Sequence, residues 1–114
     1  MSQDCLFCKI ANKELPAEII YEDENLVAFQ DIHPQAPVHI LLIPRKHIDR
    51  INNLSEDDAY LMGLLTLAAR KLAVDKGIDK SGYRILMNCN AHAGQTVFHI
   101  HMHLLGGKPL PHLG

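Results

Sequence analysis

The segment His99-Ile100-His101-Met102-His103-Leu104-Leu105 decides the fold, because its polar and apolar residues alternate one by one. This alternation has the period of a β-strand with two different faces, and it predicts a strand over Val97 to Leu105. Ile100, Met102 and Leu104 project to one face, which we expect to pack under a helix. The three histidines project to the other face, which we expect to be outward-facing. Histidine is a poor core residue, so this row indicates chemistry.

The kind of chemistry stays open at this point. Imidazole can act as a nucleophile, a general acid or base, or a metal ligand, because it exchanges protons near neutral pH. Ligands at i, i+2 and i+4 of a flat strand diverge, which disfavours one ion held by all three histidines. A solvated face or a chance cluster is the structural alternative. His39, in the next predicted strand inward, is expected on the same side, although a lone strand histidine is more often structural.

Outward from this segment, the chain contains four further runs with strand character. Hydrophobic residues bounded by turn residues place these strands at Ile19 to Glu22, Leu26 to Asp31, Val38 to Ile43 and Tyr83 to Asn88. The first two are separated by a short polar turn and pair as a hairpin. The third is closed by Pro44 and is almost wholly apolar, which is typical of a central strand covered on both faces.

Two helices are predicted, a short one over Cys5 to Asn12 and a long one of roughly 22 residues. The long helix begins at Ser55, which caps a first turn rich in acidic residues, and ends at Gly77. Its apolar stripe consists of Leu61, Leu65, Ala68 and Leu72. The expected fold class is α+β: a five-stranded antiparallel meander sheet with one long and one short helix.

The overall composition is that of an ordinary globular protein. The 114 residues are 47% hydrophobic and 21% charged, without repeats or linkers, so residues 1–114 are expected to form a single domain. Eleven basic and thirteen acidic residues leave a net charge of −2, which is too near balance for long-range attraction alone to drive binding to a nucleic acid polymer. The N-terminal stretch has no apolar segment long enough for a signal peptide or a membrane span, which predicts a cytoplasmic location without membrane contact.

Cys5-Leu6-Phe7-Cys8 forms a C-x-x-C pair. In a reducing compartment a disulfide scaffold is disfavoured, which leaves metal ligands or reduced core thiols. A redox motif is also disfavoured, because no thioredoxin-like βαβ pattern surrounds the pair. The metal and core-thiol interpretations both remain open on the residues alone.

The histidine segment follows the pattern His-φ-His-φ-His-φ-φ, where φ is an apolar residue, and in this the chain resembles the histidine triad (HIT) superfamily. The resemblance extends from Cys5 to Gly107, through residues 29–37, the corner at residues 43–47 and the turn at residues 94–98. Within the superfamily the chain looks like the histidine triad nucleotide-binding (Hint) branch, whose members resemble purine nucleoside phosphoramidases. A HIT-like version of the α+β fold is therefore expected.

The resemblance implies a reaction and its catalytic residues. In the family the middle histidine, here His101, attacks the α-phosphorus of a nucleoside 5'-phosphoramidate and expels the amine. Water then hydrolyses the covalent nucleotidyl-histidine. His103 and His39 would surround the phosphate and manage protons. The hydroxyl of Thr96, where the family more often has serine, would assist the leaving nitrogen.

The resemblance also implies a site for a purine nucleotide of the AMP type. Asp31 matches the carboxylate that binds both ribose hydroxyls. The expected apolar walls around the base are Phe7, Ile10, Phe29 and Ile32. The expected phosphate ligands are Asn88 and the main-chain amides near Gly94, Gln95 and Val97.

A metal and a partner subunit are the remaining implications. In relatives that carry C-x-x-C, two histidines join the thiolates around zinc, and here the ligands would be Cys5, Cys8, His47 and His99. Such a site would be structural, because no position is left for water, and the chemistry itself would need no cofactor. Family members also form homodimers by pairing their sheets edge to edge.

Two other functions stay open beside the phosphoramidase. One is a dinucleoside-polyphosphate hydrolase of a neighbouring HIT branch, although the turn at residues 94–97 and the Gly106-Gly107 ending favour the phosphoramidase. The other is a nucleotide- or zinc-binding regulatory module in which turnover is incidental. The tail after Gly107 lacks the Trp that many Hint proteins carry there, so the leaving group stays open, as does the choice between adenine and guanine.

Overall fold

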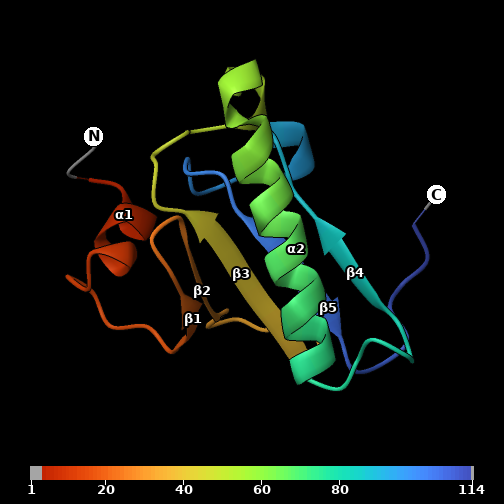
Figure 1. Ribbon diagram of the computed structural model, residues 1–114. Coiled ribbons are helices and arrows are strands. Elements are labelled where there is room, and N and C mark those ends of the chain that lie inside the picture. Colours follow the sequence, from red (N-terminus) through yellow and green to blue (C-terminus); the bar gives the residue numbers. More distant parts are fainter. Residues whose placement is uncertain (1–3, 114) are drawn as a thin grey trace.

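The computed structural model describes residues 4–113, and in this range five strands form one antiparallel sheet in the order β1-β2-β3-β5-β4 (Figure 1). The strands are β1 (Ile19–Glu22), β2 (Leu26–Gln30), β3 (Val38–Pro44), β4 (Tyr83–Leu86) and β5 (Met102–Gly106). The α+β class with five antiparallel strands is confirmed. The predicted central strand is confirmed as well, because β3 is third in the order and is buried from His39 to Pro44.

The strand order departs from a simple meander at one place. β3 and β4 follow each other along the chain, but β5 lies between them and pairs antiparallel with both. The connection from β3 to β4 contains the long helix, which carries the chain across the sheet and leaves the place beside β3 free. The last strand fills that place and so becomes internal.

Two α-helices, α1 (Leu6–Ala11) and α2 (Ala59–Asp75), occupy the two predicted helical regions. α2 has 17 residues and is shorter than predicted, because the turn Glu56–Asp58 before it is a 3-10 helix. The predicted cap is present, since Ser55 and Asp58 form a capping box around this turn. Other single-turn 3-10 helices are Ile51–Asn53 and Ala91–Ala93.

The buried side of α2 overlaps the predicted stripe only in part. Its buried residues are Leu65, Ala69, Leu72 and Ala73. Leu61 and Ala68 of the predicted stripe are half-buried. The helix therefore turns small alanine side chains toward the sheet, which allows its backbone to approach the strands closely.

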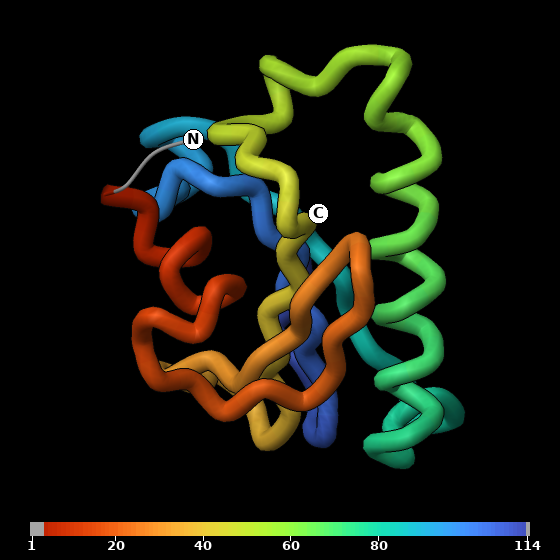
Figure 2. Tube along the Cα trace, turned by 60° about the vertical axis from the view of Figure 1, so that its left-hand side comes forward, coloured from red at the N-terminus to blue at the C-terminus, as the bar shows by residue number. Residues whose placement is uncertain are grey.

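α1 and α2 lie on opposite faces of the sheet (Figure 2). Alternate strand residues divide between the two sides, as the period of two requires. Those packed with α2 include Leu26, Ala28, Ile40, Leu42, Met102 and Leu104. Those packed with α1 are Val27, Phe29, Leu41 and Ile43. The prediction that the apolar row of the last strand packs under the long helix is thus confirmed for Met102 and Leu104, whereas Ile100 is buried outside this cluster.

The prediction of an outward-facing histidine row is wrong, because α1 covers part of that face. The exposed fraction is 0% for His99 and 3% for His39, while His101 and His103 are half-buried. The last strand also begins later than predicted. β5 starts at Met102. Two residues earlier, the amide of Ile100 donates to Ile48 O at 2.8 Å, which is not a hydrogen bond of the sheet.

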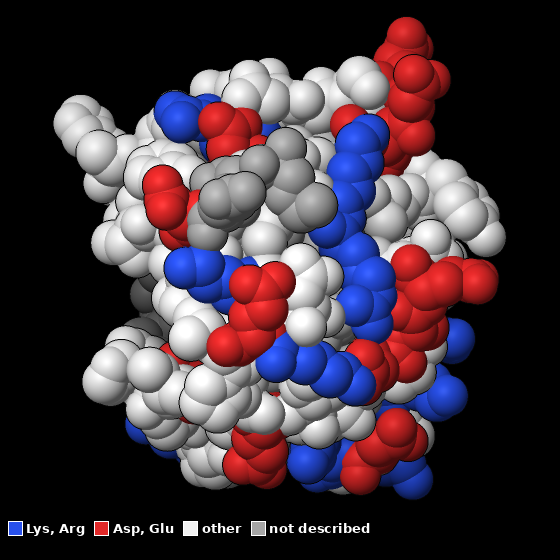
Figure 3. Space-filling model, turned by 90° about the vertical axis from the view of Figure 1, so that its left-hand side faces the viewer, with Lys and Arg blue, Asp and Glu red and all other residues white. Residues whose placement is uncertain are grey.

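Basic and acidic side chains lie next to one another on the side of the molecule that carries α1 (Figure 3). Arg45 and Lys13 each bond to Glu22, at 3.0 and 2.9 Å, and Lys46 bonds to Asp58 at 2.6 Å. The adjacent basic residues Arg45 and Lys46 are therefore both ion-paired. In residues 4–113 no helix is both long and apolar enough to cross a membrane. The prediction about a signal peptide also involved residues 1–3, which lie outside the described range.

Candidate functional site

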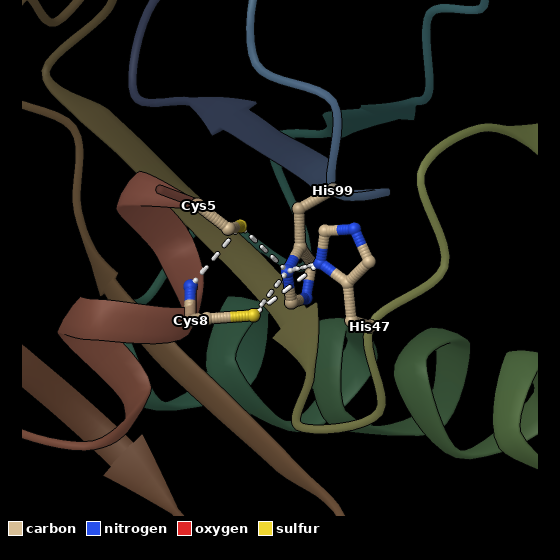
Figure 4. Close-up of side chains that lie close together, drawn as sticks. All are labelled: Cys5, Cys8, His47 and His99. Atoms are coloured by element: carbon tan, nitrogen blue, oxygen red, sulfur yellow. Dashed lines mark hydrogen bonds between the residues drawn. The ribbon is translucent and has the colours of Figure 1, made fainter. Parts of the chain in front are cut away.

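Four side chains converge between α1 and the adjacent end of the sheet, and we call them the sulfur cluster: Cys5, Cys8, His47 and His99 (Figure 4). Nδ1 of His99 lies 3.3 Å from Cys5 Sγ, 3.5 Å from Cys8 Sγ and 3.2 Å from His47 Nδ1. A tetrahedral ion with bonds of about 2.3 Å to sulfur and about 2.0 Å to nitrogen keeps such atoms roughly 3.3–3.8 Å apart. The four residues therefore lie close enough to hold a metal ion.

The local fold explains why these four residues meet. Cys5 caps the N-terminus of α1, where its sulfur accepts the amide of Cys8 at 3.3 Å, so both sulfurs lie on the first turn of the helix. His47 follows the end of β3, and His99 precedes the start of β5. Because β3 and β5 are antiparallel neighbours, the two histidines arrive at the same end of the sheet.

A main-chain carbonyl orients the ring of His99. Nε2 of this ring donates to Pro44 O at 2.7 Å, so the lone pair of the neutral ring lies on Nδ1, which faces the sulfurs. Metal-ligating histidines usually donate their second nitrogen in this way. Burial lowers the pKa of His99 to about 4 and keeps the ring neutral. Burial and the Cys5 thiol raise the pKa of Cys8 to about 11, and a bound cation would act in the opposite direction.

A second group lies on the same face of the sheet, and we call it the imidazole cluster: Asp31, His39, His101 and His103. Nε2 of His39 lies 2.9 Å from Nδ1 of His103 and 3.2 Å from Oδ2 of Asp31. The ring centroids of His101 and His103 are 5.1 Å apart. His39 comes from β3 and His103 from β5. The structure therefore brings His39 next to His103, as the sequence led us to expect.

Hydrogen-bond partners indicate which nitrogen of His39 and of His103 carries the proton. The main-chain amide of Gln35 donates to Nδ1 of His39 at 3.0 Å. The proton of the neutral His39 ring is therefore on Nε2, which donates toward His103 Nδ1 and Asp31 Oδ2. Because Nδ1 of His103 accepts, the proton of that ring is on Nε2. The pair thus forms a directed chain of N–H donors.

His101 has the opposite arrangement. Its Nδ1 donates to the main-chain oxygen of His99 at 2.8 Å, which leaves the lone pair on Nε2. Burial lowers the pKa of His101, against the opposing effects of the His99 carbonyl and Asp31. Burial, with the rings of His101 and His39 beside it, lowers the pKa of His103 to about 4. Burial also lowers the pKa of His39. All three rings are therefore neutral at pH 7.

Asp31, His39 and His103 also lie close enough together to hold a metal ion. The amide of Gln35 opposes this, because a neutral His39 ring that accepts at Nδ1 has a protonated Nε2, and a protonated nitrogen does not coordinate a metal. The imidazole cluster therefore suits proton transfer and nucleophilic attack. Sequence reasoning missed Gln35, because it acts through its main chain and its residue type carries no signal.

The residues expected around a base fall into two groups. Phe7, Ile10 and Phe29 are buried in the core beneath α1. Ile32 is 83% exposed and projects from the loop that follows Asp31. The ring of Phe7 meets the ring of His101 edge-on, with centroids 5.0 Å apart. The expected walls therefore adjoin the imidazole cluster at Phe7.

The expected phosphate ligands lie in a loop closed by its own hydrogen bonds. The amides of Gly94 and Gln95 donate to carbonyls within the loop at 3.0 and 3.1 Å, and the buried Gln95 side chain donates to Val97 O. Asn88 is half-buried, and Thr96 lines an open hollow of about 430 Å³ that adjoins the sulfur cluster. Within residues 4–113, none of these five residues hydrogen-bonds to the imidazole cluster. Thr96 itself is exposed.

Comparison with known proteins gives a consistent result. The model of the HIT domain family matches residues 12–110. The chain is 47% identical over 110 residues to the purine nucleoside phosphoramidase of Escherichia coli (strain K12), which covers 96% of this chain and 92% of that protein.

Solved structures agree with this relationship. A HIT family hydrolase from Legionella pneumophila Philadelphia 1 has a TM-score of 0.94 at 50% identity, over 95% of this chain and 96% of that one. A histidine triad protein from Clostridium difficile has a TM-score of 0.96 at 40% identity, over 100% of this chain and 99% of that one. With the fold, the histidine segment and these similarities in agreement, the chain belongs to the HIT domain family.

Proposed function

We propose that this protein hydrolyses the P–N bond of purine nucleoside 5'-phosphoramidates through a covalent nucleotidyl-histidine at His101. The observation that carries the proposal is the hydrogen bond from His101 Nδ1 to His99 O, because it leaves an unprotonated Nε2 on a neutral ring. A neutral imidazole is a competent nucleophile at pH 7. The 47% identity to a named purine nucleoside phosphoramidase supports the choice of substrate.

The first step transfers the nucleotidyl group to the enzyme. Nε2 of His101 forms a bond to the α-phosphorus, and the P–N bond of the substrate breaks. The departing nitrogen takes a proton from solvent, and the N–H at Nε2 of His103 is proposed to donate a hydrogen bond to it as it leaves. His39 supports this hydrogen bond, since its own Nε2–H donates to Nδ1 of His103.

The second step releases the nucleotide. A water oxygen bonds to phosphorus while the bond from phosphorus to His101 Nε2 breaks. One proton of the water passes to solvent, so all three rings keep their starting tautomers. The hydroxyl of Thr96 is assigned an assisting role at the leaving nitrogen.

The nucleotide is proposed to lie across the face that holds the imidazole cluster. Asp31 would bind the ribose hydroxyls through a carboxylate that already accepts the His33 amide at 2.8 Å. Asn88 and the amides at residues 94–97 would bind the phosphate. The proposed base walls are Phe7, Ile10, Phe29 and Ile32.

Zinc is the metal we assign to the sulfur cluster. Two thiolates and two imidazoles fill a tetrahedral zinc shell and leave no position for water, so the ion would stabilise the fold without taking part in the reaction.

We also propose a homodimer. β4 is an edge strand of the sheet, and its Tyr83 and Ile85 are each 37% exposed, which offers an unpaired, partly apolar edge to a second copy.

The test measures ammonia release from adenosine 5'-phosphoramidate by the wild type, His101→Ala and His92→Ala. His92 is an exposed loop histidine outside both clusters, so its variant should retain the wild-type rate. His101→Ala should lose activity. Equal rates for the wild type and His101→Ala would overturn the proposal. Diadenosine tetraphosphate in parallel reactions tests the polyphosphate alternative, which gains support if its kcat/KM exceeds that of the phosphoramidate.

A further inference from the structure

The ring of Phe7 lies between the two clusters. It meets two histidine rings edge-on: that of His101, with a centroid distance of 5.0 Å and an interplanar angle of 87°, and that of His99, with a centroid distance of 6.1 Å and an interplanar angle of 68°. It also packs against Phe29 at 5.4 Å, and its exposed fraction is 5%. One side chain of α1 therefore contacts both a residue of the sulfur cluster and the proposed nucleophile.

The position of Phe7 depends on what holds α1 in place. The helix has only six residues, fewer than an isolated helix needs to be stable in water. Its two cysteines flank Phe7 and point into the sulfur cluster, where they meet His99 and His47 from the sheet. A metal ion bound by these four residues would fix α1, and with it Phe7, against the end of the sheet.

A second connection runs through His99. Its Nδ1 faces the two sulfurs, its Nε2 donates to Pro44 O, and its own carbonyl accepts the Nδ1 proton of His101 at 2.8 Å. The residue that would bind the metal through its side chain therefore holds the nucleophile through its main chain. Both the ring and Nδ1 of His101 are therefore in contact with groups attached to the sulfur cluster.

We propose that metal binding at the sulfur cluster positions the nucleophile, with the Phe7 ring and the His99 carbonyl holding the His101 imidazole in one orientation and one tautomer. Phe7 is then a positioning residue in addition to a wall of the base site. The kinetic part of the test rests on the proposed function, whereas the spectroscopic part does not.

The kinetic experiment separates the two roles of Phe7. In Phe7→Leu a positioning role predicts that kcat falls about tenfold while KM changes little, because a misplaced nucleophile affects the chemical step. A role as base wall alone predicts the reverse, a higher KM with unchanged kcat. Leu65→Val also removes a small volume from the core on the α2 side and should leave kcat unchanged. Phe7→Tyr retains the ring and should restore kcat to near the wild-type value.

The spectroscopic experiment uses substrate-free protein with 15N-labelled histidine. In the zinc-loaded wild type, His101 should give the signal of a single Nδ1–H tautomer. After removal of zinc by a chelator, and in zinc-loaded Phe7→Leu, this signal should broaden or shift toward a mixture of tautomers. Metal analysis of Phe7→Leu should still give one zinc per chain, which shows that the variant is folded around its metal.

The outcomes are distinguishable. An unchanged His101 signal in both the chelated wild type and zinc-loaded Phe7→Leu would overturn the inference, as would a change in KM alone. Absence of phosphoramidate turnover by the wild type would instead reject the proposed function, and the NMR comparison would still decide whether the sulfur cluster positions His101.

Discussion

The sulfur cluster and the imidazole cluster share one segment of chain and similar interatomic distances, yet they use their protons in opposite ways. In the sulfur cluster, His99 donates its N–H to a main-chain carbonyl, so its lone pair faces the neighbouring ligands. In the imidazole cluster, His39 accepts a main-chain amide, so its N–H faces the neighbours. The difference teaches that the partner of the remote nitrogen, and not the distance between side chains, decides whether a histidine group binds a metal or transfers a proton.

The largest expected effect is a loss of turnover with no change in metal content. His101→Ala should lower phosphoramidate turnover by about a thousandfold or more, because the nucleophile is lost, while zinc stays at one ion per chain. Steady-state kinetics and metal analysis on the same preparation check this. Loss of zinc from this variant would show that the two clusters are not separate sites.

A smaller effect is expected from His39→Asn. The Asn side-chain oxygen can accept the Gln35 amide, but the variant lacks the donor to His103 Nδ1. We expect kcat to fall by about tenfold to a hundredfold, less than the loss of a group that itself exchanges a proton with the substrate would cause, because His39 acts through His103; zinc content should be unchanged. If kcat is unaffected, the directed donor chain from His39 to His103 does not take part in the reaction.

The converse experiment is Cys8→Ser, which should release the metal. The unfolding midpoint should fall by about 10 °C or more, since each kcal/mol corresponds to roughly 4–8 °C in a domain near this size. Turnover should fall only about tenfold, through loss of positioning. Calorimetry and metal analysis provide the measurement, with Cys89→Ser as the matched control, since Cys89 lies outside the cluster. Equal midpoints for the two variants would contradict a structural metal site.

The smallest expected effect is a pH dependence of stability caused by His103, which faces His39, His101 and Asp31. The folded-state pKa of this ring, about 4, lies below its ordinary value of 6.5. The unfolded chain therefore binds a proton at His103 below about pH 6.5 where the folded chain does not, and stability falls as the pH drops from 6.5 to 4. Thermal unfolding midpoints of the wild type should fall more steeply over this range than those of His103→Asn. Parallel curves would contradict the lowered pKa.

Much of the fold was accessible from the sequence, because it follows from periodicity. Runs of strand-forming residues placed β1 and β3 correctly, the period of two placed Met102 and Leu104 under α2, and the acidic turn after Ser55 located the start of the long helix. The position of β5 between β3 and β4 was missed, because strand order depends on where a long connection returns the chain. The burial of His99 was missed for a related reason: a six-residue helix distant in sequence covers it.

The site was accessible at the level of residue types and family. The family, the fold class and the enzyme class are confirmed, and the four residues of the sulfur cluster lie together as expected. The roles of individual site residues, zinc itself, the homodimer, the single domain and the cytoplasmic location stay predictions. The contribution of Gln35 was not accessible, because any residue except proline supplies the same amide.

The hydrogen bond from His101 to the carbonyl of residue 99 has a consequence for how such a protein can change during evolution. The bond uses the main chain, so any residue at position 99 can supply it, provided that the backbone there is held in the same place. A lineage could exchange the metal ligands for apolar residues that pack α1 against the sheet as firmly as the metal would, and keep the tautomer of its nucleophile. Metal dependence would then be a trait that descendants of one enzyme can gain or lose, while the reaction itself is inherited unchanged.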